Sequence, residues 1–193
     1  MKKIALLAFL LLASCMGVPE NVEIVDGVNA EQYLGTWYEI ARLDHSFERG
    51  LDNVTAQYEQ NADGSIKVIN KGYNREEKEW NKAIGKAYFI EKANADNTYL
   101  GKLKVSFFGP FYGAYNIIAL DKVYYNYVMI CGPNKDYLWI LSRTPELSYP
   151  IKQELVSQAK ALGFATDKLI YVNQNPDIPN YDAGKHVIKK KAE

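Results

Sequence analysis

Two cysteines and two histidines are the residues of this sequence with the greatest potential for chemistry. A thiol nucleophile needs a base beside it, and a metal site needs several ligands held close together. His45 stands in a stretch predicted to be a long loop over residues 44–52, and His186 stands near the C-terminus, so neither is expected beside Cys131. We therefore predict no catalytic residues, no metal site and no cofactor. Free cysteines are among the most buried residue types, so Cys131 is expected in the apolar core, with a reactive thiol as the alternative.

The other cysteine, Cys15, follows a targeting segment. Lys2 and Lys3 supply positive charge, and residues 4–12 form an apolar run too short to span a membrane. The segment Leu12-Ala13-Ser14-Cys15 resembles the lipobox at which bacterial lipoproteins are cleaved and acylated. Cys15 is thus predicted to be a lipidated N-terminus, with an ordinary signal peptide that contains a cysteine as the alternative. Each buried CH₂ contributes about 0.8 kcal/mol, so two or three acyl chains hold a protein on a membrane almost permanently.

A strand at residues 35–42 is the clearest prediction in the central part of the chain. Trp37, Glu39 and Ala41 fall on one face, as the period-2 pattern of a strand requires. A helical turn over residues 29–34 is expected just before it. Seven further runs, separated by turn residues, predict strands at 53–59, 66–73, 80–91, 99–108, 113–121, 125–132 and 137–143.

A helix is predicted to begin at Ser148 and to end at Gly163. Its apolar residues recur at spacings of four and three, so one stripe should pack against the outside of the strands. Residues 168–172 can pair as a short ninth strand. The prediction is an all-β fold, an eight-stranded up-and-down antiparallel barrel with a C-terminal helix packed on the outside.

Three short segments resemble, in order and spacing, the signature regions of the lipocalins. They are Gly35-x-Trp37, the strand end that contains Asp121, and the lone Arg143 before the helix. A closer resemblance, to the bacterial outer-membrane lipoprotein lipocalins, lies in segments 70–74, 104–113 and 131–133. The resemblance covers about residues 28–172. It implies the lipocalin calyx, with the Arg143 guanidinium across the Trp37 indole at the closed end.

Four segments follow from these observations. They are a lipoprotein signal peptide at 1–14, a lipidated N-terminus and tether at 15–28, a lipocalin domain at 29–172 and a flexible C-terminal tail at 173–193.

The inward-facing residues follow from strand parity and from the resemblance, because lipocalins point this tryptophan inward. The residues expected to line a ligand site are Ala41, Val54, Ala56, Val68, Asn70, Gly85, Ala87, Val105, Phe107, Tyr115, Ile117, Val128, Tyr137 and Trp139, with Ile130 and Leu141 also inward. Small residues on one wall face aromatic residues on the other, which favours a cavity over a solid core. A closely packed barrel without a ligand is the alternative.

Polar groups of this interior are expected near the mouth of the barrel. Tyr115, Tyr137 and Asn70 could bond the polar end of a long hydrocarbon there. Glu39 is the one charged residue expected to face inward, and a buried carboxylate needs a partner or a raised pKa. A structural hydrogen bond is favoured for Glu39 over a cationic ligand. The aromatic run 107–112 is also expected at the mouth, either docking on a membrane or partner or folding onto the barrel rim.

The resemblance implies a membrane-anchored protein, not an enzyme, that binds and stores or carries fatty acids or lysophospholipids. The formal net charge of zero argues against nucleic acid as a partner. Met16 after the cysteine favours the outer membrane, at its periplasmic face, and a homodimer is left open. The alternatives are a lipocalin-fold enzyme acting on a small hydrophobic substrate and a structural envelope lipoprotein.

Overall fold

A computed structural model describes residues 16–178 of the 193-residue chain. The predictions for the signal peptide, Cys15, His186 and the last part of the C-terminal tail fall outside that range. Within it, no helix has the length and apolar character needed to cross a membrane.

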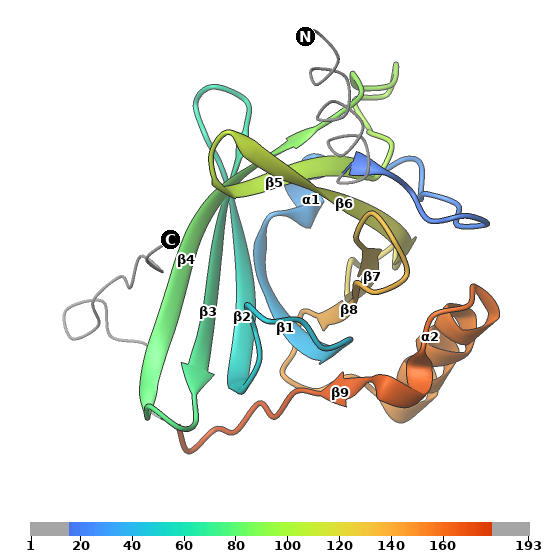
Figure 1. The fold of residues 1–193 in the computed structure, drawn as a ribbon. Helices are drawn as coiled ribbons and strands as arrows, with labels where there is room; N and C mark the ends of the chain where they lie inside the picture. Colours follow the sequence, from blue (N-terminus) through green and yellow to red (C-terminus); the bar gives the residue numbers. More distant parts are fainter. Residues whose placement is uncertain (1–15, 179–193) are drawn as a thin grey trace, which may run out of the picture.

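Eight antiparallel strands form the body of the molecule (Figure 1). Their bounds are β1 Gly35–Arg42, β2 Leu51–Gln60, β3 Ile66–Asn74, β4 Glu79–Phe89, β5 Lys102–Phe108, β6 Phe111–Leu120, β7 Tyr127–Cys131 and β8 Leu138–Ser142. Each of β2 to β7 pairs with the next strand along the chain, and β1 pairs with both β2 and β8. The sheet therefore closes on itself, and the predicted up-and-down barrel is confirmed.

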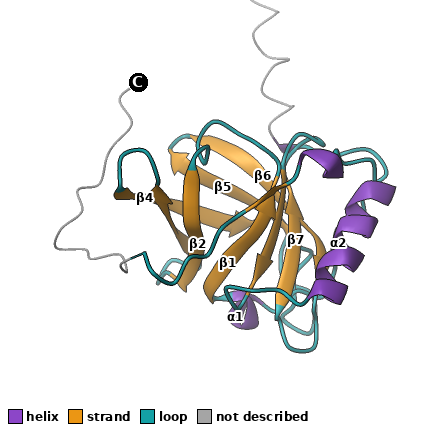
Figure 2. Ribbon diagram, turned by 90° about the horizontal axis from the view of Figure 1, so that it is seen from below, coloured by secondary structure: helices purple, strands orange, loops and turns teal. Residues whose placement is uncertain are grey.

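The short helix α1, Ala30–Tyr33, lies at one end of the barrel, which we call the closed end (Figures 1 and 2). The side chain of Asn29 caps it by accepting a hydrogen bond from the backbone N–H of Gln32 at 3.0 Å. Gly35 follows with a φ of +94°, in the left-handed region that glycine adopts at no steric cost. The other end, which carries loop 43–50 and the β5–β6 turn, is called the open end.

The helix α2, Tyr149–Ala161, covers the outside of β1, β7 and β8 (Figure 2). Its buried residues Leu155 and Ala159 pack in one apolar cluster with Ile40, Met129 and Ile140. This second core explains why those strands carry apolar residues on both faces, as the helix pattern predicts.

A β-bulge in β1 changes which side chains face inward. Pairing with β8 shifts between Glu39, opposite Leu141, and Ala41, opposite Ile140. Ala41 therefore joins the outer cluster under α2, and Arg42, opposite Trp139, turns toward the interior instead. The prediction that Ala41 faces inward is wrong, because strict alternation fails across a bulge.

The first described residues are bound to the barrel and do not form a free tether. The Gly17 carbonyl accepts a hydrogen bond from the buried Asn116 side chain at 3.0 Å. Further along, Val28 is fully buried and pairs with Tyr99 in an isolated bridge. The described part of the tether that we predicted at residues 15–28 is thus hydrogen-bonded to the barrel at several points.

The chain after α2 fills a gap between β1 and β2. These two strands pair only from Gly35 to Tyr38, and the short strand β9, Ile170–Tyr171, takes the place of β2 beside the end of β1. The side chain of Gln174 then donates to the backbone carbonyls of Glu39 and Val54, at 2.9 Å each. The C-terminal tail that we expected to be flexible from residue 173 is thus bonded to the barrel at its beginning.

Candidate functional site: the barrel cavity

Trp37 and Arg143 form the floor of the barrel. Trp37 is fully buried, and its indole N–H donates to the Tyr33 carbonyl at 2.9 Å. The Arg143 guanidinium carbon lies 3.8 Å from the Trp37 ring centre, the arrangement that the lipocalin resemblance implies. The same guanidinium donates to the carbonyls of Gln32, Thr36 and Tyr125, which joins α1, β1 and the β6–β7 turn.

The two other signature residues support this floor. A side chain at Gly35 would lie 3.3 Å from the Arg143 guanidinium, so a glycine leaves the room that the arginine needs. Asp121 accepts hydrogen bonds from the backbone N–H groups of Val123, Tyr124 and Asn126. It therefore fixes the β6–β7 turn from which Tyr125 offers its carbonyl to Arg143.

A cavity of about 120 Å³ lies above this floor, and its lining is mostly apolar. Of the residues predicted to line a ligand site, it contacts Val54, Ala56, Val68, Asn70, Ala87, Val105, Phe107, Tyr115 and Trp139, and it also contacts Ile130 and Leu141. Apolar cavities of about 150 Å³ stay dry and take up small apolar molecules. The volume suits part of one hydrocarbon chain.

Four further predicted residues face inward or lie close to the mouth but do not border the cavity. Ile117 and Val128 are fully buried in the inner core below it. Gly85 is covered by the Phe107 ring, since a side chain there would meet that ring at 2.8 Å. The expectation that Gly85 opens space is therefore wrong. Tyr137 stacks beside His45 and Trp139, with ring centres 6.1 and 6.2 Å away, in the turn before β8.

A cluster of three tyrosines lies deep in the cavity. The Tyr115 hydroxyl is 2.6 Å from that of Tyr33 and 2.9 Å from that of Tyr58. Burial raises the pKa of all three phenols, so they remain neutral hydrogen-bonding groups. The expectation that Tyr115 lies near the mouth is wrong, because its partner Tyr33 belongs to α1 at the closed end.

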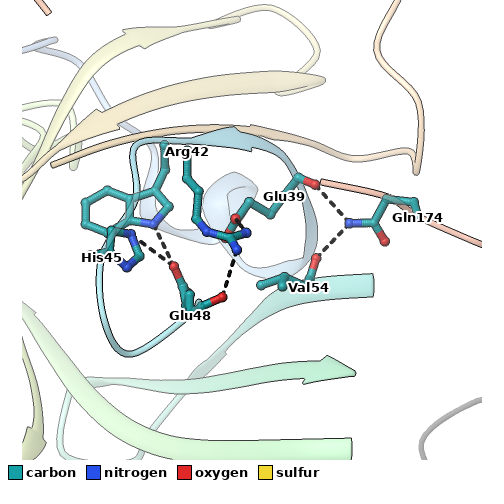
Figure 3. A network of polar contacts seen from close by, with 7 residues as sticks. Glu39, Arg42, His45, Glu48, Val54 and Gln174 are labelled. Carbon is teal, nitrogen blue, oxygen red and sulfur yellow. Dashed lines mark hydrogen bonds and ion pairs between the residues drawn. The ribbon is translucent and has the colours of Figure 1, made fainter. Parts of the chain in front are cut away.

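A network of buried charged side chains lies at the upper wall (Figure 3). Arg42, 2% exposed, donates to the Glu39 carboxylate at 2.7 Å and to the Glu48 backbone carbonyl at 2.7 Å. The Trp139 indole N–H donates to the Glu48 carboxylate at 3.0 Å. These bonds hold loop 43–50 over the cavity, and they give Glu39 the structural hydrogen bond that its position requires.

The charge state of this network is set mainly by burial. Burial, and next the neighbouring Glu48, raise the pKa of the Glu39 carboxyl well above its usual range. Burial also raises the pKa of Glu48. Burial and the nearby Arg42 lower the pKa of His45 to about 4, so this histidine is neutral at pH 7. His45 Nε2 lies 3.2 Å from a Glu48 carboxylate oxygen, but neither ring nitrogen has a partner in hydrogen-bond geometry.

Several cavity residues were missed by the sequence prediction. Phe47 and Glu48 reach the cavity from loop 43–50, where strand alternation gives no information. Tyr58 belongs to a predicted strand, and its parity with Val54 and Ala56 could have placed it inside. The inward turn of Arg42 has no visible signal, since the bulge that causes it leaves no mark in the sequence.

Cys131 lies outside the cavity, in the apolar cluster under α2. Burial raises the pKa of its thiol to about 12, which makes the thiolate scarce at neutral pH. Among residues 16–178, no group of three or more His, Cys, Asp or Glu is placed to hold a metal ion.

A closed antiparallel barrel with a floor at one end and an apolar cavity inside it is a calyx that encloses one small hydrophobic molecule. The chain belongs to the lipocalin family, because the model of the lipocalin-like domain matches residues 28–174.

Relatives and solved structures agree with this assignment. The outer membrane lipoprotein Blc of Vibrio cholerae is 50% identical over 169 residues, 88% of this chain and 96% of the relative. The outer membrane lipoprotein Blc of Escherichia coli K12 is 52% identical over 168 residues, 86% of this chain and 92% of the relative. The structure of insecticyanin from the tobacco hornworm Manduca sexta has a TM-score of 0.64 at 22% identity and covers 86% of this chain and 90% of that one. It supports the fold alone.

Proposed function

We propose that this protein is a membrane-anchored carrier that holds one hydrocarbon chain of a fatty acid or lysophospholipid inside its barrel. The apolar cavity above the Trp37 floor carries the proposal. A volume of about 120 Å³ fits one chain better than the two chains of a phospholipid. The polar end of the lipid would stay at the open end, beside the charged network and the unpaired side-chain oxygen of Asn70.

The proposed location is the periplasmic face of the outer membrane. Relatives with 50% and 52% sequence identity carry the name outer membrane lipoprotein. The lipobox resemblance at Cys15 supports the same attachment, through acylation of this cysteine. The proposed partners are therefore a lipid ligand and the membrane that receives the acyl chains, with a homodimer left open.

The described residues offer little support for a catalytic activity in addition to lipid carriage. Cys131 faces the outer cluster with a raised pKa, and His45 is neutral within the network at the mouth. A nucleophile with an adjacent base does not arise from this arrangement. We therefore propose that the protein is not an enzyme.

Extraction of lipids from the protein purified out of its own membranes tests the cargo. Mass spectrometry is expected to find single-chain lipids at close to one per protein. Recovery of two-chain phospholipids alone, or of no lipid in repeated preparations, would contradict the proposal.

A further substitution tests the anchor independently of the cargo. Cys15→Ser is expected to leave the protein unprocessed or to release it from the membrane fraction, because the acyl chains can no longer be attached. Labelled palmitate should enter the parent protein and not the variant. Equal labelling of both forms would rule out Cys15 as the anchor.

A further inference from the structure

Three phenylalanine side chains are exposed at the open end of the barrel. Phe47 in loop 43–50 is 56% exposed, and Phe108 and Phe111 beside the β5–β6 turn are 66% and 73% exposed. Phe47 also borders the cavity, and Phe108 and Phe111 lie at the same end of the barrel. We call Phe47, Phe108 and Phe111 the mouth patch. Exposed apolar groups of this kind mark a surface that meets a membrane or another apolar partner.

The described chain begins at the same end of the molecule. The Asn116 side chain donates to the Gly17 carbonyl at 3.0 Å and to the Gly132 carbonyl at 3.1 Å, which ties Gly17 to the β7–β8 turn at the open end. Figure 2 shows this starting point at the end of the barrel away from α1. Cys15 precedes Gly17 by two residues, and two residues span at most about 7 Å. Acyl chains on Cys15 would therefore be attached within about 7 Å of Gly17, at the same end of the barrel as the mouth patch.

We propose that the mouth patch rests in the interface of the membrane that receives the Cys15 acyl chains, so that lipid passes directly between the bilayer and the cavity. This proposal rests on the proposed anchor and adds an orientation to it. A protein held only by a free tether could present any face to the membrane. Here residues 17–28 are bonded along the barrel, so the anchor and the open end are held on the same side.

Aromatic insertion, and not charge attraction, is the chemistry of this contact. The loops of the open end carry charges of both signs, and Arg49 is already paired with Asp44 at 2.6 Å. An uncharged contact of aromatic rings suits the interfacial region of a bilayer, where such rings gather. Binding should therefore depend little on anionic lipid or on salt.

The β6–β7 turn gives a matched control at the closed end. Tyr124 is 77% exposed, as open to solvent as Phe111, but it lies next to the floor of the barrel. The buried Cys131 thiol, with its pKa raised to about 12, should resist labelling at pH 7. A cysteine introduced at either position can therefore carry a fluorescent label selectively.

The test uses the acylated protein in vesicles of phosphatidylethanolamine and phosphatidylglycerol. Phe111→Cys and Tyr124→Cys are each labelled with an environment-sensitive nitrobenzoxadiazole group, and quenching by nitroxide-labelled lipid is measured. We expect at least fivefold stronger quenching at position 111 than at position 124, unchanged by salt and by protein density. Equal quenching at both positions, stronger quenching at 124, or a signal at 111 that appears only at high protein density would overturn the proposal. The last result would show that the mouth patch contacts a second copy of the chain and not the membrane.

A second pair of variants tests the passage of lipid. The double substitution Phe108→Ser with Phe111→Ser removes two rings that do not border the cavity, and Tyr124→Ser is its control. We expect about tenfold slower uptake of a fluorescent fatty acid from vesicles, with the affinity for the same fatty acid in solution unchanged. An unchanged uptake rate would overturn the proposed orientation. Absence of fatty-acid binding by the parent protein, or failure of the protein to float with vesicles, would instead count against the proposed function.

Discussion

Arg143 stabilises the closed end through contacts that a lysine cannot reproduce. Its planar guanidinium lies over Trp37 and reaches three backbone carbonyls at once, on α1, β1 and the β6–β7 turn. A lysine carries the same charge on a single flexible amine, so it can satisfy only part of this set.

Arg143→Lys is therefore expected to lower the free energy of unfolding by about 1 to 2 kcal/mol, the size of a partly desolvated cation–π contact. Denaturant midpoints followed by tryptophan fluorescence would measure the loss. Arg49→Lys is the control, because Arg49 makes an exposed ion pair with Asp44 and the same chemical change there should cost little. Equal midpoints for parent and Arg143→Lys would contradict the role given to this floor.

His45 makes the stability of the protein sensitive to acid. Its pKa is lowered to about 4 in the folded protein, against about 6.5 in an unfolded chain, so the unfolded state binds more protons between these values. Stability contributed by the neutral ring is present above pH 6.5 and is lost as the pH falls toward 4. The raised pKa values of Glu39 and Glu48 act in the opposite direction, because their folded forms take up protons first.

His45→Phe keeps an aromatic ring beside Phe47, whose centre is 4.1 Å from that of His45, and removes the titration. Between pH 7 and pH 4 the variant is expected to lose about 2 to 3 kcal/mol less stability than the parent, since one pKa unit corresponds to about 1.4 kcal/mol. Urea unfolding at the two pH values gives the comparison. Equal losses of stability in both proteins would show that His45 is not the group responsible for the acid sensitivity.

At the scale of elements, alternation and turn residues predict all eight strands and the helix, because the barrel buries one face of every strand. They do not predict the bulge at Ile40 or the bonding of the C-terminal segment. A bulge depends on pairing with β8, about 100 residues away in the sequence, and no local pattern records it. Most strand residues predicted to line a ligand site therefore border the cavity, whereas Ala41 and Gly85 do not, and the residues of loop 43–50 were missed.

The segment that follows β9 contributes stability to the open half of the barrel. Gln174 bridges two backbone carbonyls where β1 and β2 have separated, and Asn53 bonds the backbone of Asn175 on both sides. This segment therefore supplies hydrogen bonds between β1 and β2 where the two strands do not pair directly.

Gln174→Glu keeps the shape of the side chain but replaces the donating amide by a carboxylate that faces two carbonyls. We expect a loss of about 1 to 3 kcal/mol, the cost of leaving these partly buried polar groups unsatisfied. Amide exchange of β1 and β2 should also become faster near Glu39 and Val54. Gln153→Glu, on the exposed face of α2, is the control and should change neither quantity.

At the scale of the whole molecule, the barrel separates two cores with different roles. The outer core under α2 is filled by side chains, and the inner core leaves a cavity above the Trp37 floor. The first described residues and the mouth patch lie at the end where that cavity opens. Under the proposed function, this arrangement places the membrane anchor and the lipid site at the same end of the fold.

The central claim is that the cavity holds a hydrocarbon chain, and filling the cavity tests it most directly. Ala87 borders the cavity, while Ile84 is on the same strand, is 43% exposed and points outward. Enlarging a residue into empty space costs little stability, whereas overpacking a filled core costs typically about 1 to 3 kcal/mol.

The measurement is a titration of parent, Ala87→Phe and Ile84→Phe with a fluorescent fatty acid, read with tryptophan emission in proteins that carry Trp80→Phe, so that Trp139 at the cavity wall and the floor Trp37 are the emitting residues. We predict that Ala87→Phe keeps near-normal unfolding midpoints and loses at least tenfold in affinity. The parent and Ile84→Phe should bind alike, with a change in Trp139 emission. Unchanged affinity in a folded Ala87→Phe protein, or a parent protein that shows no binding and no emission change, would contradict the lipid-carrier account.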